Sequence, residues 1–164
     1  MKALFAKGFG VSGLAALVMF AAVDADAASR SFAATACVTG PGSAAHLVNQ
    51  GQVWTPNTTP VTDYCPVVSD TNISARFATQ IDVYGWSTGP GTISATACRS
   101  SISGGNAVCA TATTSTATNA ADHLAVFPTI GGAGWGGGSN EKDGFYVVIA
   151  YKSSAAIFNY SFTS

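Results

Sequence analysis

Charge is scarce in this sequence. Of its 164 residues only 9% are Asp, Glu, Lys or Arg, and the formal net charge at pH 7 is −1. The cations that follow residue 27 are spread along the chain, at Arg30, Arg76, Arg99, Lys142 and Lys152. A nucleic-acid partner requires clustered Lys and Arg side chains that neutralise phosphates. The scarcity and spread of the cations therefore exclude a nucleic acid as the partner.

Long apolar runs are absent except at the start of the chain. Two lysines precede an uncharged stretch from Gly8 to Val23, which is shorter than the roughly 20 apolar residues of a membrane span. Ala25-Asp26-Ala27 then places small residues at the two positions that a signal peptidase reads. This order predicts a cleavable signal peptide over residues 1–27. We expect the remainder to be secreted, periplasmic or exposed at the cell surface.

A retained membrane anchor is the alternative interpretation of the same segment. Asp24 and Asp26 at the end of the apolar run disfavour it. Cleavage after Ala27 leaves 164 minus 27, or 137, residues, which is a typical size for one domain with a single hydrophobic core. The sequence therefore predicts one exported domain over residues 28–164, without a membrane span.

Metal-ligand patterns are missing as well. The two histidines, His46 and His123, are isolated, and we interpret both as surface or hydrogen-bonded core residues. A zinc site requires cysteines paired at close spacing or lying near histidines, and neither pattern occurs. Asn140, Glu141 and Asp143 lack the ligand periodicity of a calcium loop. We expect neither a metal nor another cofactor.

Cysteines are few but even in number, at Cys37, Cys65, Cys98 and Cys109. An even count in an exported chain favours disulfides over metal ligation. Four cysteines allow three connectivities. The turn residues 103–106 between Cys98 and Cys109 would bring neighbouring strands together, which favours that pair and leaves Cys37 with Cys65. We therefore predict two disulfides with this connectivity.

Helical periodicity is nearly absent after residue 27, where only Asn119 to His123 fits one helical turn, and strand periodicity takes its place. The clearest alternation runs from Ile73 to Gly85, where Phe77, Ile81 and Val83 share one face. Further strands are expected over 31–38, 45–53, 64–68, 92–98, 107–113, 123–127, 144–151 and 156–162, with Gly, Pro, Asn and Ser clusters between them. Eight or nine short strands predict an all-β fold, an antiparallel two-sheet β-sandwich of the immunoglobulin-like or jelly-roll-like kind.

One segment fits a hydrolase pattern. Gly85-Trp86-Ser87-Thr88-Gly89 matches G-x-S-x-G, and Asp122 and His123 follow in the chain order of a catalytic triad. The mechanism requires a strand, a sharp turn and a helix around the serine, but Gly89-Pro90-Gly91 and a further strand follow here. Adjacent residues of a strand also point to opposite faces, so Asp122 and His123 are not expected to pair. We interpret the segment as a hairpin turn and keep a secreted serine hydrolase using Ser87 as an alternative.

Acidic residues offer no clear second site. Glycoside hydrolysis needs two carboxyl groups held close together across the sugar. Asp82 is expected on the polar face of a strand, whereas Glu141 and Asp143 fall in a loop. Solvated surface charges explain these acids, and we expect no catalytic residue among them.

The three tryptophans provide the best functional signal. Trp54, Trp86 and Trp135 fall in or beside predicted turns, where a β-sandwich exposes binding side chains, and flat indole faces stack on sugar rings. Burial at one end of the core is the competing interpretation, since an indole stabilises a small domain strongly when it is buried. Trp135 stands in a glycine-rich segment with little to pack against. We predict a non-catalytic binding module whose partner is a polysaccharide or another component of the cell envelope.

The last strand carries alternating aromatics at Phe158, Tyr160 and Phe162, which are expected to line one face of the core. A terminal strand of this kind also suits a structural or adhesive subunit that is completed by a neighbour's strand. We keep strand sharing as a further alternative.

Several segments carry a resemblance to a known group. These are Tyr64-Cys65-Pro66-Val67-Val68, Ile81-Asp82-Val83-Tyr84, the cysteines at 98 and 109, Gly144-Phe145-Tyr146-Val147 and Ile157-Phe158-Asn159-Tyr160. Together they resemble uncharacterised secreted bacterial proteins that are predicted to be disulfide-containing β-sandwiches. Members of the group carry a further cysteine where this chain has Val148, Ile149 or Ala150. The resemblance implies export and a β-sandwich, and it implies no activity.

Overall fold

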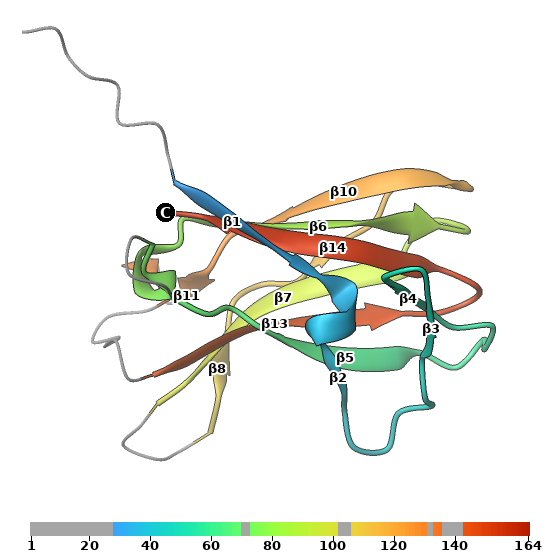
Figure 1. Cartoon of the computed structure of the whole chain (residues 1–164), viewed down its shortest axis with the longest axis horizontal. Coiled ribbons are helices and arrows are strands. Elements are labelled where there is room, and N and C mark those ends of the chain that lie inside the picture. The colour runs from blue at the N-terminus through green and yellow to red at the C-terminus, as the bar shows by residue number, and fades with distance from the viewer. Residues whose placement is uncertain (1–27, 70–72, 102–105, 131–132, 136–142) are drawn as a thin grey trace, which may run out of the picture.

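The computed structural model describes residues 28–69, 73–101, 106–130, 133–135 and 143–164 (Figure 1). The predicted signal peptide, residues 1–27, lies outside the described residues, as do Asn140, Glu141 and Lys142. No helix in the described ranges is long and apolar enough to cross a membrane.

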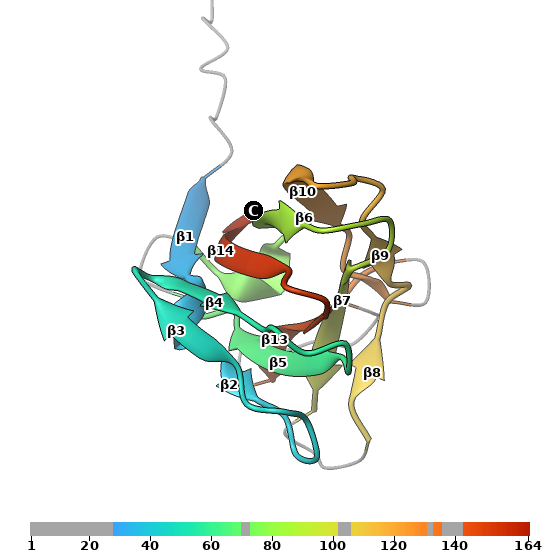
Figure 2. The same ribbon diagram turned by 90° about the vertical axis from the view of Figure 1, so that its right-hand side faces the viewer.

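Two antiparallel six-stranded sheets form the domain, and Figure 2 shows them as two layers seen from one end. The first, called the β14 sheet, contains β1 (Ser29–Ala33), β3 (Leu47–Asn49), β4 (Gln52–Trp54), β6 (Gln80–Ser87), β10 (Ala120–Val126) and β14 (Ala156–Thr163). The second, called the β13 sheet, contains β2 (Val38–Thr39), β5 (Val61–Pro66), β7 (Ile93–Ser100), β8 (Val108–Cys109), β9 (Thr113–Thr114) and β13 (Gly144–Tyr151). Two short 3-10 helices, η1 (Ala34–Ala36) and η2 (Ala75–Phe77), and the strand pair β11 (Thr129–Ile130) and β12 (Ala133–Gly134) complete the described chain.

The strand order in the β14 sheet is β10-β6-β14-β4-β3, with β1 also paired to β14. The order in the β13 sheet is β2-β5-β13-β7-β8, with β9 also paired to β7. The central strands of both sheets therefore come from the end of the chain. β14 is paired on both sides within the chain, by β6 on one side and by β1 and β4 on the other.

The predicted all-β, two-sheet class is confirmed, with more strands than the eight or nine expected. The count rises because bends split predicted strands. The segment 45–53 becomes the hairpin β3–β4, whose turn residues Gln50 and Gly51 have φ angles of 50° and 84°, in the left-handed region that tight hairpin turns use. The segment 31–38 is divided by η1 into β1 and β2.

Both predicted disulfides are confirmed. Cys37 is bonded to Cys65, and both residues are buried where η1 meets β5. Cys98 is bonded to Cys109 and joins β7 to β8, with Cys109 exposed.

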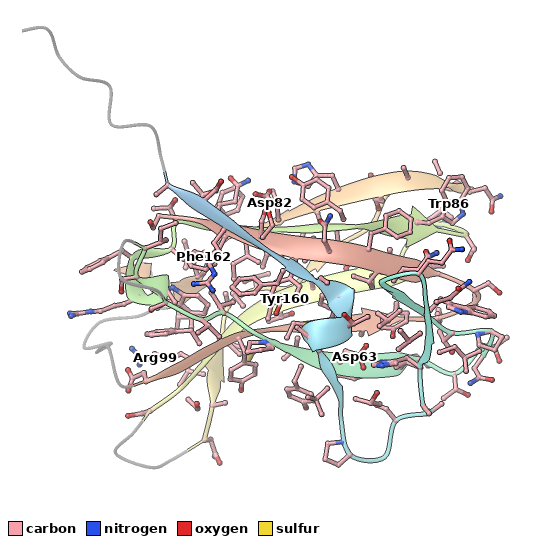
Figure 3. The ribbon with its side chains drawn as sticks, in the orientation of Figure 1. Asp63, Asp82, Trp86, Arg99, Tyr160 and Phe162 are labelled. Atoms are coloured by element: carbon pink, nitrogen blue, oxygen red, sulfur yellow. A yellow bond between two sulfur atoms is a disulfide. The ribbon has the colours of Figure 1, made fainter. Side chains whose placement is uncertain are left out.

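The core lies between the sheets and follows the alternation of the strands. In β13 the side chains of Phe145, Val147, Ile149 and Tyr151 point inward and are buried. From the opposite layer β14 contributes Ile157, Tyr160 and Phe162, and Figure 3 shows Tyr160 and Phe162 pointing between the layers. Phe32 of β1 closes this side, since its ring stacks on Tyr160 with the centroids 5.1 Å apart.

A β-bulge in β14 corrects the prediction that Phe158 shares a buried face with Tyr160 and Phe162. Ile157 is paired with Gly85 and Asn159 with Tyr84, so two steps along β14 match one step along β6. The extra residue shifts the alternation, and Phe158 is 38% exposed instead of buried. The bulge therefore lets Ile157 and Tyr160, three residues apart, both point inward.

The strand predicted over residues 73–85 begins later than expected. Phe77 lies in η2 and is 60% exposed, and regular pairing starts at Gln80. Phe77 fits the period-two pattern in the sequence, but it precedes the first residue of β6 that is paired in the sheet.

Two buried tyrosines give the domain an expected pH dependence. Burial raises the pKa of Tyr160 from 10.0 to about 12, and burial, together with a hydrogen bond to Asp63, raises the pKa of Tyr151. Because the folded state holds these protons more tightly than the unfolded chain, the stability contribution is complete below pH 10 and falls as the pH rises towards 12. Urea unfolding across this range is expected to show the decline. A double variant, Tyr151→Phe and Tyr160→Phe, that retains the same slope would contradict this origin.

Candidate functional site

Two tryptophans and one alanine form a row across the β14 sheet. Ala156 in β14 is the register partner of Trp54 in β4 and of Trp86 in β6. Directly paired residues of adjacent strands point to the same face of a sheet. We call Trp54, Ala156 and Trp86 the aromatic row. The same register extends to Leu47 in β3 and Ala121 in β10.

The aromatic row lies on the outer face. Next to the members of the row, Val53 and Ile157 point inward and are buried, and Gly85 is buried as well. Trp86 is 42% exposed and Trp54 is partly exposed. Figure 3 shows Trp86 and Asp82 on the side of the sheet away from Tyr160 and Phe162.

Gly85 keeps the strands of the aromatic row close together. A Cβ atom at this position would collide with the carbonyl oxygen of Ala156 and with the side chain of Ile93. The close approach requires glycine, because any side chain would push β6 away from β14. Gly85 of the G-x-S-x-G segment is thus explained by strand packing.

A polar cluster lies beside the aromatic row. Tyr84 precedes Trp86 by two residues and shares its face, and the His123 ring of β10 stacks on Tyr84 with centroids 4.7 Å apart. His123 Nε2 donates to Asp82 Oδ1 over 2.6 Å, and Gln80 Nε2 donates to the same oxygen over 2.6 Å. Asp82 Oδ2 forms no hydrogen bond within the described ranges. Asp82 is only 7% exposed, so its carboxylate is largely covered by its neighbours.

The bulge in β14 adds two exposed groups to the same region. Asn159 is the register partner of Tyr84, so its amide lies next to the polar cluster. The exposed ring of Phe158 lies along β14 between Ala156 and Asn159. The outer face of the β14 sheet thus combines aromatic rings with amide, imidazole and carboxylate groups.

Trp135 does not belong to this surface, which corrects the prediction that its ring is open to a ligand. Its relative exposure is 0%, and its indole packs against Phe145 with ring centroids 5.0 Å apart. The backbone φ of 49° and a hydrogen bond from its N–H to the carbonyl of Pro128 turn the side chain inward. The prediction failed because the packing partner, Phe145, comes from β13 and not from the neighbouring glycines.

The hydrolase residues are only partly brought together. Ser87 has 0% exposure and its hydroxyl lies 2.6 Å from that of Ser115 and 3.3 Å from Asp122 Oδ2. His123 points to the other face, as predicted, and pairs with Asp82. No histidine contacts Ser87 in the part of the chain that the structure describes, so the base that the serine mechanism requires is not beside it. A polar network joins the buried Ser87 and Ser115 to the partly exposed Asp122.

A second histidine–carboxylate pair lies inside the domain. His46 Nδ1 is 3.0 and 2.9 Å from the two carboxylate oxygens of Asp63, which is buried, and the Tyr151 hydroxyl donates to Asp63 over 2.7 Å. Thr39 lies 3.1 Å from the same ring nitrogen. Orientation of an imidazole by a carboxylate also occurs in general-base sites, but no nucleophile among the described residues contacts His46 Nε2. The pair ties the chain before β3 to β5 and β13.

The remaining candidates carry no site. No group of three or more His, Cys, Asp and Glu side chains that could hold a metal occurs within the described ranges. Asp143 is buried and lies 3.9 Å from Arg99 Nε. A shallow cavity of about 160 Å³, lined by Thr92, Tyr151 and neighbouring residues, is smaller than the roughly 300 Å³ of the smallest usual ligand pockets.

Sequence reasoning found Trp54 and Trp86 but not their neighbours. The period of two in β6 places Asp82, Tyr84 and Trp86 on one face, and this signal is present in the sequence. Ala156 and Asn159 join the face only through strand order and through the bulge. No local pattern marks either of them.

Comparison of the chain with protein-family models, with curated proteins and with solved structures finds no match.

Proposed function

We propose that this protein is exported and that its domain binds glycans without chemical conversion, through the outer face of the β14 sheet. The observation that carries the proposal is the aromatic row, in which Trp54 and Trp86 flank Ala156 in register on an exposed sheet face. An indole supplies a flat apolar surface for the C–H face of a sugar ring. A regular sheet also holds such side chains more rigidly than a loop does.

The polar cluster supports a sugar more than a purely apolar ligand. The exposed side chains of His123 and Asn159 provide donors and acceptors for hydroxyl groups beside the stacking surface, and the largely buried Asp82 orients His123. The Gln80 and His123 hydrogen bonds fix the Asp82 carboxylate in advance, which reduces the ordering cost of binding. Two disulfides, which persist in oxidising compartments, agree with a protein that works outside the cytoplasm.

Replacement of Trp86 by alanine is expected to weaken glycan binding about tenfold or more, because tryptophan at the centre of a binding surface commonly carries much of the affinity. The measurement is retention of the purified, oxidised protein on a panel of polysaccharides and cell-envelope glycans. The matched control is Tyr64→Ala, since Tyr64 is 41% exposed but belongs to β5 of the other sheet. Loss of binding in both variants, or in neither, would contradict this site.

A further inference from the structure

We infer that the aromatic row selects an extended, ribbon-like polysaccharide of the β-1,4-linked type, which crosses the strands with one sugar ring over each of β4, β14 and β6. This inference rests on the proposed function and specifies its ligand. The juxtaposition that carries it is an exposed indole, Trp86, and a partly exposed indole, Trp54, on alternate strands with the smallest chiral side chain between them.

The spacing of the row sets the repeat of the ligand. Adjacent strands lie about 4.8 Å apart, so the Cα atoms of Trp54 and Trp86, two strands apart, are separated by about 10 Å. A sugar ring in an extended β-1,4-linked chain advances by nearly one strand spacing. One ring on Trp54 therefore places the next ring over Ala156 and the third over Trp86. Rings that are two units apart in such a ribbon have the same orientation, so both can present one face to an indole.

The middle position supports a continuous chain in place of two separate sugars. Ala156 is buried, with 9% exposure, and its methyl group is the small side chain of the row between the larger side chains on β4 and β6. Its neighbours Ala155 and Ile157 are buried. A longer side chain at position 156 would stand in the path between the two indoles.

The same geometry disfavours other ligands. An α-1,4-linked glucan curves, so three consecutive rings do not follow a straight row. A monosaccharide contacts one indole only. Single-stranded nucleic acids also stack on aromatic rings, but they need cations along the backbone, and the acidic and basic side chains identified on this face, Asp82 and His123, include no Lys or Arg. An uncharged linear polysaccharide fits the row and its surroundings best.

The test is equilibrium binding of oligosaccharide ladders from the monosaccharide to the hexasaccharide. β-1,4-linked glucose and N-acetylglucosamine ladders are compared with an α-1,4-linked glucose ladder, on the oxidised protein. We expect at least about a tenfold gain in affinity between the disaccharide and the tetrasaccharide in a β-1,4 ladder and no such gain in the α-1,4 ladder. Trp54→Ala and Trp86→Ala are each expected to remove that gain.

The decisive variant is Ala156→Gln, which obstructs the middle of the row but keeps both indoles. Its matched control is Ala121→Gln, because Ala121 is exposed at the end of the same register, outside the tryptophan pair. We expect Ala156→Gln to abolish the length-dependent gain and Ala121→Gln to preserve it. If Ala156→Gln does not fold, the inference is tested by the ladders with Trp54→Ala and Trp86→Ala, and a length-dependent gain that persists in both variants would contradict it.

Two failures are distinguishable. If binding depends on Trp86 but shows no dependence on chain length or prefers the α-1,4 ladder, the ribbon inference is overturned and the proposed glycan site stands. If no glycan binds in a Trp86-dependent way, both the inference and the proposed function are overturned.

Discussion

Replacement of Trp135 by alanine is expected to lower the free energy of unfolding by about 3–5 kcal/mol, the usual cost of removing a buried tryptophan or phenylalanine. The indole is fully buried against Phe145 and fills the end of the core near Pro128. Its removal leaves a cavity that the paired strands β11 and β12 cannot readily close. Urea unfolding followed by circular dichroism measures the change.

Two controls separate the role of the indole ring from that of its N–H group. Trp135 Nε1 is buried without a hydrogen-bond partner among the described residues, so Trp135→Phe keeps the ring packing and removes an unsatisfied donor. We expect Trp135→Phe to lower the free energy of unfolding by less than Trp135→Ala does. Trp86→Ala on the exposed face is expected to change stability by about 1 kcal/mol or less. Equal costs for Trp135→Ala and Trp86→Ala would show that Trp135 is not a core residue.

Removal of the Cys37–Cys65 bridge is expected to lower the free energy of unfolding by about 3–4 kcal/mol, and removal of the Cys98–Cys109 bridge is expected to lower it by about 3 kcal/mol. The difference follows from loop length, because the bridged cysteines are 28 and 11 residues apart. The total of about 6 kcal/mol is comparable with the full stability of many domains, about 5–15 kcal/mol. Reduction is therefore expected to unfold much of the population at ambient temperature.

The two bridges are also expected to be reduced in a fixed order. Cys109 is exposed, whereas Cys37 and Cys65 are both buried, so an external thiolate reaches the Cys98–Cys109 bridge first. Timed thiol labelling with mass spectrometry gives the order. The contribution of each bridge to the free energy of unfolding is measured with two double variants. One combines Cys37→Ala with Cys65→Ala, and the other combines Cys98→Ala with Cys109→Ala. Faster reduction of the buried pair, or a larger cost for the shorter loop, would contradict this account.

The features that sequence predicted correctly depend on local spacing. Alternation within β13 and within the later half of β6 is visible residue by residue, and it identified the two-sheet class. The eleven-residue separation of Cys98 and Cys109 around a turn identified one bridge, and the count of four then identified the other. These inferences need no knowledge of which strands become neighbours.

The features that sequence missed depend on contacts between distant segments. Phe158 fits the pattern of a buried face until β14 pairs with β6, where Ile157 opposes Gly85 and Asn159 opposes Tyr84, which leaves Phe158 as the extra residue. Trp135 reads as exposed among glycines because Phe145, its packing partner, lies beyond them in the chain. The aromatic row has the same origin, since residues 54, 86 and 156 meet only when β14 inserts between β4 and β6.

That insertion also determines when the fold can form. β1, β4 and β6 have no common partner until residues 156–163 have been synthesised, because all three pair with β14. Contacts between segments so far apart in the chain are slow to form, and they cannot begin during the elongation of the first 155 residues. A nascent chain that ends before β14 therefore cannot complete the β14 sheet.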